Sequence, residues 1–195
     1  MRLVLATRNA HKLREIGRLL AEHEIEALPA GVELPPETGQ TFADNALPKA
    51  RTAAAATGRA AIADDSGIAA EALGGAPGVR SARYAGAQAS DAENLDRLRA
   101  EVPARSPLAY VCSLAFVDPE RGEERVFEGR CTGTMAAEPR GEGGFGYDPA
   151  FVPDDRDDGR TMAELSDAEK DAISHRGRAA RALAGWLAAE REVAR

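Results

Sequence analysis

The sequence predicts an α/β fold built around a mixed β-sheet. Strand-like and helix-like segments alternate through the first half of the chain, a pattern typical of parallel strands joined by helices, and a hairpin-like pair of strands follows in the middle. With 195 residues, 44% of them hydrophobic and 29% charged, the chain is long enough for one domain with a substantial core. We therefore expect a single domain over residues 1–195.

The first expected elements are a strand and two helices. Residues 2–6 form a short apolar run, and apolar residues at helical spacing follow Asn9, a suitable N-cap. An alanine-rich helix should begin after Thr41, which starts a capping-box pattern, and should end at Gly58. Pro48 lies inside that helix and should kink it.

The remaining elements complete the sheet and its cover. We expect strands over residues 60–63, 108–117, 124–129 and 150–152, and helices capped at Ser90 and Ser166, the second of which should end near residue 190. The strand over 60–63 should end at Asp64. The strands over 108–117 and 124–129 should pair as a hairpin through a turn rich in polar residues.

The charge of the chain argues against a nucleic-acid-binding protein. Its net charge is -7 and its pI about 5.1, whereas binding to a phosphate backbone needs a clustered basic surface. Neither a signal-peptide core nor a membrane span is visible in the sequence, so we expect a cytoplasmic protein. Cys112 and Cys131 lie in strand-like segments without C-x-x-C spacing and should be buried, reduced thiols.

The loop between the first strand and the first helix is a candidate phosphate site. It consists of Thr7, Arg8, Asn9, Ala10, His11 and Lys12. A strand that feeds a helix through such a loop directs backbone N–H groups and cationic side chains to one place, which suits a phosphate. An ordinary capped helix start with solvated cations explains the same residues.

The adjacent Asp64 and Asp65 form a candidate metal site. Neighbouring carboxylates raise one another's proton affinity unless a cation compensates them. Because side chains alternate along a strand, the two carboxylates should point in different directions. Glu37 lies on a stiff Pro-rich loop, and Glu37 with Asp65 would suffice for Mg2+ together with waters and phosphates. A turn rich in Asp, Ser and Gly is the alternative.

Two further motifs do not have the context that their usual ligands require. Gly141, Gly143 and Gly146 satisfy G-x-G-x-x-G, but no helix is expected to start within the pattern, which argues against a dinucleotide-binding turn. The acidic run over residues 154–159 does not fit an EF-hand loop, because Arg156 would occupy a ligand position. We expect this run to be a solvated loop.

The last expected helix carries a group of polar residues. Lys170, Ser174 and His175 fall near one helix face, and Arg176 lies beside them. A solvated polar face explains the same spacing.

Taken together, the motifs resemble those of the inosine triphosphate pyrophosphatase family, which includes bacterial dITP/XTP pyrophosphatases. In order along residues 7–176 they are TRNxxK, PETG, TFADNAxxKA, ADDSG, ALGGAPG, SARYAG, GGFGYDPxF, TxAEL and EKxxISHR. The resemblance implies an elongated mixed sheet flanked by helices, two lobes with a nucleotide cleft between them, and a homodimer. It also implies Mg2+-dependent hydrolysis of ITP, dITP and XTP to the monophosphate and pyrophosphate.

The resemblance also assigns roles to the candidate residues. Residues 7–12 and Lys49 would hold the triphosphate, Glu37 and Asp65 would bind the metal, Asp65 would activate the attacking water, and Ser66 would contact the substrate. The nucleoside end would be formed by Phe145, Gly146, Tyr147, Asp148, Lys170, His175 and Arg176. Donors such as Arg176 or His175 would suit a 6-oxo purine, whereas the 6-amino group of adenine would leave them unsatisfied.

The chain departs from the family pattern at two places. Asp44 stands where the family more often has Glu, and Pro48 directly before Lys49 is unusual, so a kink would displace that lysine. Two alternatives keep the same motifs: a related pyrophosphatase acting on other bases, such as modified pyrimidines, and a nucleotide-binding module without catalysis. The presence of Asp65 and Glu37 argues against the second.

Overall fold

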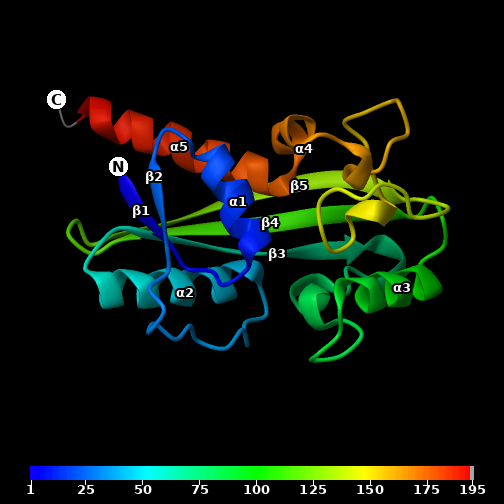
Figure 1. Cartoon of the computed structure of the whole chain (residues 1–195), viewed down its shortest axis with the longest axis horizontal. Helices are drawn as coiled ribbons and strands as arrows, with labels where there is room; N and C mark the ends of the chain where they lie inside the picture. Colours follow the sequence, from blue (N-terminus) through cyan, green and yellow to red (C-terminus); the bar gives the residue numbers. More distant parts are fainter. Residues whose placement is uncertain (194–195) are drawn as a thin grey trace. The chain divides into compact units, whose positions relative to one another are not determined.

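The structure is a computed structural model in which residues 1–193 are described, with side chains through Glu190. Its strands are β1 (Arg2–Leu5), β2 (Glu24–Ala27), β3 (Ala61–Ala70), β4 (Pro107–Asp118), β5 (Glu123–Met135) and β6 (Phe151–Pro153). Its α-helices are α1 (Ala10–Leu19), α2 (Phe42–Thr57), α3 (Asp91–Glu101), α4 (Asp167–Ile173) and α5 (His175–Val193) (Figure 1). In this described part, no helix is both long and apolar enough to cross a membrane.

The strands form one mixed sheet in the order β2-β1-β3-β4-β5-β6. β1 pairs in parallel with β2 and β3, whereas β5 pairs antiparallel with β6. β4 and β5 are neighbours joined by a short turn, as predicted for the hairpin. The prediction of an α/β fold with a mixed sheet flanked by helices is confirmed.

The chain divides into two compact units. Unit 1 comprises Met1–Asp65, Cys112–Gly129 and the chain from Arg176 onward, and unit 2 comprises Ser66–Val111 and Arg130–His175. The strands β3, β4 and β5 each contribute residues to both units.

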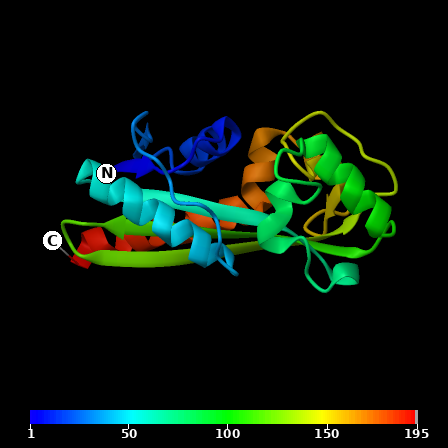
Figure 2. The same ribbon diagram turned by 90° about the horizontal axis from the view of Figure 1, so that it is seen from below.

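In unit 1, helices cover both faces of the strands. On one face, Leu5 and Ile62 pack with Ile16 of α1 and Leu183 of α5. On the other face, Val4 packs with four buried alanines of α2, at positions 46, 50, 53 and 54. Val4 and Leu5 reach different layers because successive strand side chains point to opposite faces. Figures 1 and 2 show α2 and α5 on opposite sides of these strands.

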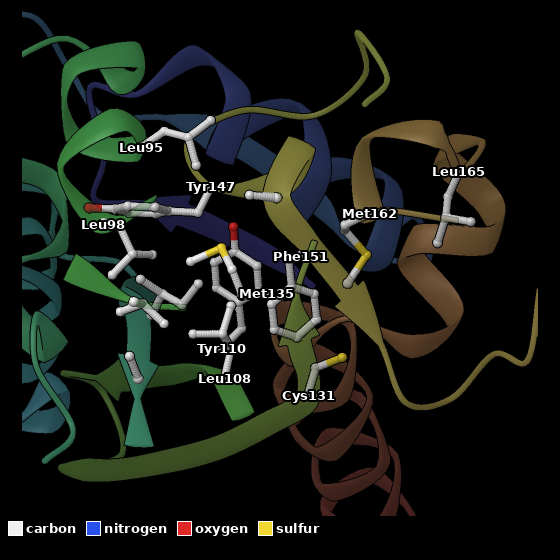
Figure 3. Packing of buried hydrophobic residues seen from close by; sticks show 14 residues of the cluster. Leu95, Leu98, Leu108, Tyr110, Cys131, Met135, Tyr147, Phe151, Met162 and Leu165 are labelled. Carbon is white, nitrogen blue, oxygen red and sulfur yellow. The ribbon is translucent and has the colours of Figure 1, made fainter. Parts of the chain in front are cut away.

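Unit 2 has an apolar core of its own (Figure 3). Helix α3 contributes Leu95 and Leu98, and β4 contributes Tyr110. The ring of Tyr110 lies against Phe151, with 4.7 Å between the ring centroids. Cys131 belongs to this core and Cys112 to that of unit 1, which confirms the prediction of buried free thiols.

Local sequence signals define several helix ends as predicted. Asn9 caps α1, and Thr41, Ser90 and Ser166 begin the capping boxes of α2, α3 and α4. Gly58 ends α2 with φ at 64°, a left-handed conformation that glycine adopts without steric cost.

Three expected element boundaries are wrong. The strand expected over 124–129 continues as β5 to Met135. β3 does not end at Asp64 but continues to Ala70, because both aspartates are buried among compensating partners that allow the strand to go on. The helix expected from Ser166 to residue 190 is broken at Ser174, whose backbone is extended with ψ at 154°. β2 was not expected, since half of its sequence EIEA is charged.

Candidate functional site

Polar side chains organise the loop between β1 and α1. Asn9 Oδ1 accepts hydrogen bonds from the backbone N–H groups of His11 at 2.8 Å and Lys12 at 3.3 Å. Thr7 Oγ1 accepts one from the N–H of Asn9 at 3.1 Å, and Ala10 begins the helix. The predicted strand, loop and capped helix are therefore present. Because Asn9 already caps these N–H groups, the cationic side chains are the stronger phosphate candidates in this loop.

Arg8 lies in surroundings that differ from those expected of a phosphate ligand. Its Nη1 donates to the carbonyl of Leu28 at 2.9 Å, and its Nη2 donates to the carbonyls of Pro29 and Val32, each at 2.8 Å. The guanidinium thus ties the loop before α1 to the segment after β2.

Asp64 lies at the centre of a buried group of charges in unit 1, which we call the charge cluster: Lys12, Glu15, Asp64 and Arg176. Asp64 Oδ2 is 3.0 Å from Lys12 Nζ, and it is 3.2 Å from Nε and 3.1 Å from Nη2 of Arg176. Arg176 is 1% exposed and also pairs with Glu15. Burial alone would raise the pKa of Asp64, but the cations around it bring that pKa well below its ordinary value. Asp64 is therefore ionised at neutral pH.

Asp65, the next residue of β3, faces different partners, as the alternation of strand side chains predicts. Its Oδ2 accepts a hydrogen bond from Asn45 Nδ2 at 2.8 Å, and its Oδ1 is 4.0 Å from Lys49 Nζ. Burial raises the pKa of Asp65, and the carboxylate of Glu37 raises it further, while Lys49 opposes the rise. Of the two aspartates, Asp65 is the more basic.

Lys49 links the carboxylates of Glu37 and Asp65. Its Nζ donates to Glu37 Oε1 at 2.6 Å and to the backbone carbonyl of Asp64 at 2.8 Å. Helix α2 continues through Pro48, and Lys49 still reaches Asp65. The proline therefore does not remove the lysine from this group.

Glu37 and Asp65 fit a hard divalent cation. Mg2+ takes oxygen ligands and is commonly held by one or two carboxylates, with waters and substrate phosphates completing its shell. The two carboxylates flank a single ammonium group, so added positive charge near them would be electrostatically favourable. Within the described residues, no group of three or more His, Cys, Asp and Glu side chains is placed to hold a metal ion.

In unit 2, the loop over residues 141–147, which we call the glycine loop, lies against the side chain of Asp148. A Cβ at Gly144 would overlap the Asp148 carboxylate, so only glycine fits there. Asp148 Oδ2 accepts hydrogen bonds from the backbone N–H of Phe145 at 2.9 Å and from Lys170 Nζ at 2.7 Å. The ammonium group lies 5.1 Å from the centre of the Phe145 ring, a cation–π distance. Phe145, Asp148 and Lys170 thus come together as the sequence predicts.

The two aromatic residues of this loop have different surroundings. Tyr147 belongs to the core of unit 2 (Figure 3). Its hydroxyl donates a hydrogen bond to the carbonyl of Ser81 at 2.7 Å. Burial raises the pKa of Tyr147. Phe145 is only half-buried, which leaves it the better candidate for stacking on a base.

Two other residues predicted to contact the substrate have surroundings of their own. Gly146 donates its N–H to Asp91 at 2.8 Å. Ser66 is a half-buried residue within β3.

The break at Ser174 separates residues that sequence spacing placed on one helix face. Lys170 and His175 belong to unit 2, where His175 stacks on Tyr110 with 4.6 Å between ring centroids and 6° between ring planes. Arg176 belongs to unit 1 and to its charge cluster. The expectation of one continuous polar face is therefore wrong.

Sequence reasoning missed Glu15, Asn45 and Tyr110 as members of these groups. Glu15 follows Lys12 by three residues and Asn45 precedes Lys49 by four, so helical spacing could have indicated both. Tyr110 occupies an ordinary alternating strand position and carries no such signal.

Comparison with known proteins defines the family. The Ham1 family matches residues 3–186. The chain is 51% identical to a dITP/XTP pyrophosphatase of Frankia alni, over 96% of this chain and 97% of the relative. Two solved structures share its fold. The HAM1 protein from Coxiella burnetii is 43% identical, with a TM-score of 0.83, and the match covers 96% of this chain and 98% of that one. The Ham1 protein from Staphylococcus aureus is 35% identical, with a TM-score of 0.82, and the match covers 97% of this chain and 100% of that one. The resemblance seen in the motifs is confirmed, and the chain belongs to the Ham1 family.

Proposed function

We propose that this chain hydrolyses the deaminated purine nucleoside triphosphates ITP, dITP and XTP to the monophosphate and pyrophosphate, and so keeps their bases out of DNA and RNA. Membership of the Ham1 family and the relatives named dITP/XTP pyrophosphatase support this activity. Within the structure, one observation carries the proposal. The two adjacent aspartates of β3 have different surroundings: cations lower the pKa of Asp64, whereas burial raises the pKa of Asp65 and makes it the more basic.

Asp65 is the proposed catalytic residue. It takes a proton from the water that attacks the α-phosphorus, while the bond from that phosphorus to the bridging oxygen breaks and pyrophosphate leaves. Its raised pKa makes it a stronger base than an exposed aspartate, and Asn45 fixes the orientation of its carboxylate.

Glu37 and Asp65 are the proposed ligands of Mg2+. When bound, the cation would supply positive charge that acidifies the attacking water and offsets the charge of the phosphates. Its binding would also offset the negative charge of the two carboxylates, which lie on either side of the Lys49 ammonium group.

The triphosphate is proposed to bind to residues of unit 1. Lys12 and Lys49 stabilise the negative charge that develops on the leaving pyrophosphate. The other proposed contacts are Thr7, Asn9, Ala10 and His11, together with Ser66 of unit 2. Arg8 donates to backbone carbonyls, so we assign it to holding this loop rather than to the phosphates. Arg176 is buried in the charge cluster, so we assign it to orienting Asp64 and Lys12 rather than to the base.

The base is proposed to bind to residues of unit 2. Phe145 offers an aromatic face, Asp148 an acceptor and His175 a donor, while Gly146, Tyr147 and Lys170 shape their surroundings. We further propose that residues 1–195 act as one bilobed domain, that the protein is a homodimer in the cytoplasm where the nucleotide pool lies, and that it does not bind nucleic acid.

One assay tests the proposed function. The protein is incubated with Mg2+ and with ITP, XTP, dATP, dGTP or dTTP separately, and pyrophosphate is measured against orthophosphate. We expect pyrophosphate from ITP and XTP and little product from the other three. Release of orthophosphate, or turnover of dATP and dGTP as fast as ITP, would reject the proposal.

A further inference from the structure

We propose that Tyr110 is a positioning residue for recognition of the base, acting through Asp148 and His175. The inference rests on the proposed function, because that function identifies the base as a 6-oxo purine. Tyr110 lies in the core of unit 2, where its hydroxyl donates to Asp148 and its ring stacks on His175, so it acts through these two neighbours.

The hydroxyl of Tyr110 fixes the carboxylate of Asp148. It donates a hydrogen bond to Asp148 Oδ1 at 3.0 Å, whereas Phe145 and Lys170 both donate to Oδ2. Asp148 is 3% exposed, and its carboxylate is held by hydrogen bonds at both oxygens. Loss of the hydroxyl would remove the hydrogen bond that holds Oδ1, so the carboxylate could turn about the axis defined by its Oδ2 contacts.

The ring of Tyr110 also orients His175. The two rings are nearly parallel, 6° apart, with 4.6 Å between their centroids. His175 directly follows the break at Ser174, where the chain leaves α4 and enters α5. An aromatic stack at this point restricts the rotation of the imidazole, and so directs its ring nitrogens.

Tyr110 is anchored more firmly than the groups that it orients. It lies in β4, which has β3 and β5 as neighbours, and its ring packs against Phe151 (Figure 3). Asp148 begins a short 3-10 helix (Asp148–Ala150) after the glycine loop, and His175 begins a helix. One rigid strand residue therefore sets the positions of an acceptor and a donor.

This arrangement can discriminate between purines. A carboxylate oxygen that accepts one hydrogen bond can accept another. A 6-oxo purine carries a hydrogen on N1 that can be donated to such an acceptor, whereas N1 of adenine is itself an acceptor and would be repelled. Loss of the Tyr110 hydroxyl should therefore weaken binding of ITP more than binding of dATP.

The test is the variant Tyr110→Phe, which keeps the ring and its stack but removes the hydroxyl. We expect its KM for ITP to rise by about tenfold, the size of effect given by a lost hydrogen bond to a charged group, with kcat within about twofold of the wild type. The ratio of kcat/KM for ITP to that for dATP should fall by a similar factor. Tyr84→Phe is the matched control, because Tyr84 also donates to a carboxylate in unit 2, that of Glu101, and lies outside the proposed site.

The outcomes separate the inference from the proposed function. If the wild type releases no pyrophosphate from ITP, the proposed function and the inference that rests on it both fail. If the wild type is active and Tyr110→Phe keeps the wild-type ratio of ITP to dATP, or loses kcat equally for every substrate, only the inference fails. As a second readout, Tyr110→Leu should shift the His175 imidazole resonances in NMR spectra by removing the stack, whereas Tyr110→Phe should leave them near their wild-type positions. Unchanged resonances in Tyr110→Leu would contradict the orienting role.

Discussion

At the scale of single residues, Asp64 and Asp65 show how two neighbouring carboxylates acquire different chemistry. Asp64 is held ionised by Lys12 and Arg176, while burial raises the pKa of Asp65. The difference arises because one side chain of β3 faces the charge cluster and the next faces α2. The same strand therefore supplies a structural anion and a candidate base.

This difference in pKa predicts that replacing each aspartate by asparagine has a different effect on the free energy of unfolding. Asp64→Asn should lower the free energy of unfolding by about 3 kcal/mol, because it leaves buried cations without their anion. Asp65→Asn should not lower stability, because burial already disfavours the charged form there, but it should lose most turnover while nucleotide affinity stays within about tenfold. Urea unfolding at pH 7 with a metal chelator measures the first effect, and the pyrophosphate assay with nucleotide titration measures the second.

The pH dependence of unfolding provides the control. Because the folded-state pKa of Asp64 is lowered, its stabilising contribution is present above the unfolded-state pKa of about 3.9 and is lost as the pH falls toward the folded-state value. The difference in stability between the wild type and Asp64→Asn should therefore shrink below about pH 4. A constant difference, or near-normal turnover by Asp65→Asn, would contradict these assignments.

At the scale of elements, one position of the glycine loop, Gly144, is restricted both by its close contact with Asp148 and by its backbone conformation. Gly144 has φ at 68° and contacts the Asp148 carboxylate so closely that a Cβ would overlap it. Gly74 has a similar φ of 61°, but a Cβ there would meet no atom within 4 Å. A comparison of the two positions therefore distinguishes the effect of the left-handed backbone, which both share, from the effect of steric overlap, which only Gly144 has.

Gly144→Ala should impair nucleotide binding, whereas Gly74→Ala should not. Both variants should lose about 1 kcal/mol of stability from the left-handed backbone, but only the first would displace Asp148 and raise the KM for ITP. Thermal unfolding and steady-state kinetics of the two variants check the prediction. Equal KM values would show that the loop accommodates the added methyl group without moving Asp148.

At the scale of the whole molecule, each unit contains one buried thiol. Cys112 lies in the core of unit 1 and Cys131 in that of unit 2. Burial raises the pKa of Cys112 to about 12, so its reactive thiolate is scarce at neutral pH. Three strands contribute residues to both units.

We therefore expect the two thiols to become reactive together. In the single-thiol variants Cys112→Ala and Cys131→Ala, labelling by a thiol reagent should be negligible in the native state. After correction for the stability of each variant, it should begin over the same range of urea, as one cooperative domain requires. Labelling of one thiol at clearly lower urea would show that the units unfold separately.

Short-range signals in the sequence determined the helix caps, the strands and helices of the first half apart from β2, the hairpin and the motifs that indicate the family. These features depend on neighbours a few residues apart, as at Asn9, Thr41 and Gly58. Candidate pairs such as Asp148 with Lys170 also followed from the motifs, and the structure brings them together.

Only the tertiary structure decided where β3 ends, where the last helix breaks, and which partners Arg176 and Tyr110 have. Asp64 meets Arg176 across 112 positions of sequence, and Tyr110 meets Asp148 across 38. The cost of burying a charge depends on these distant partners, so no local pattern could show that two adjacent aspartates continue a buried strand. For the same reason, a tyrosine that looks like any strand residue becomes the contact that positions Asp148 and His175.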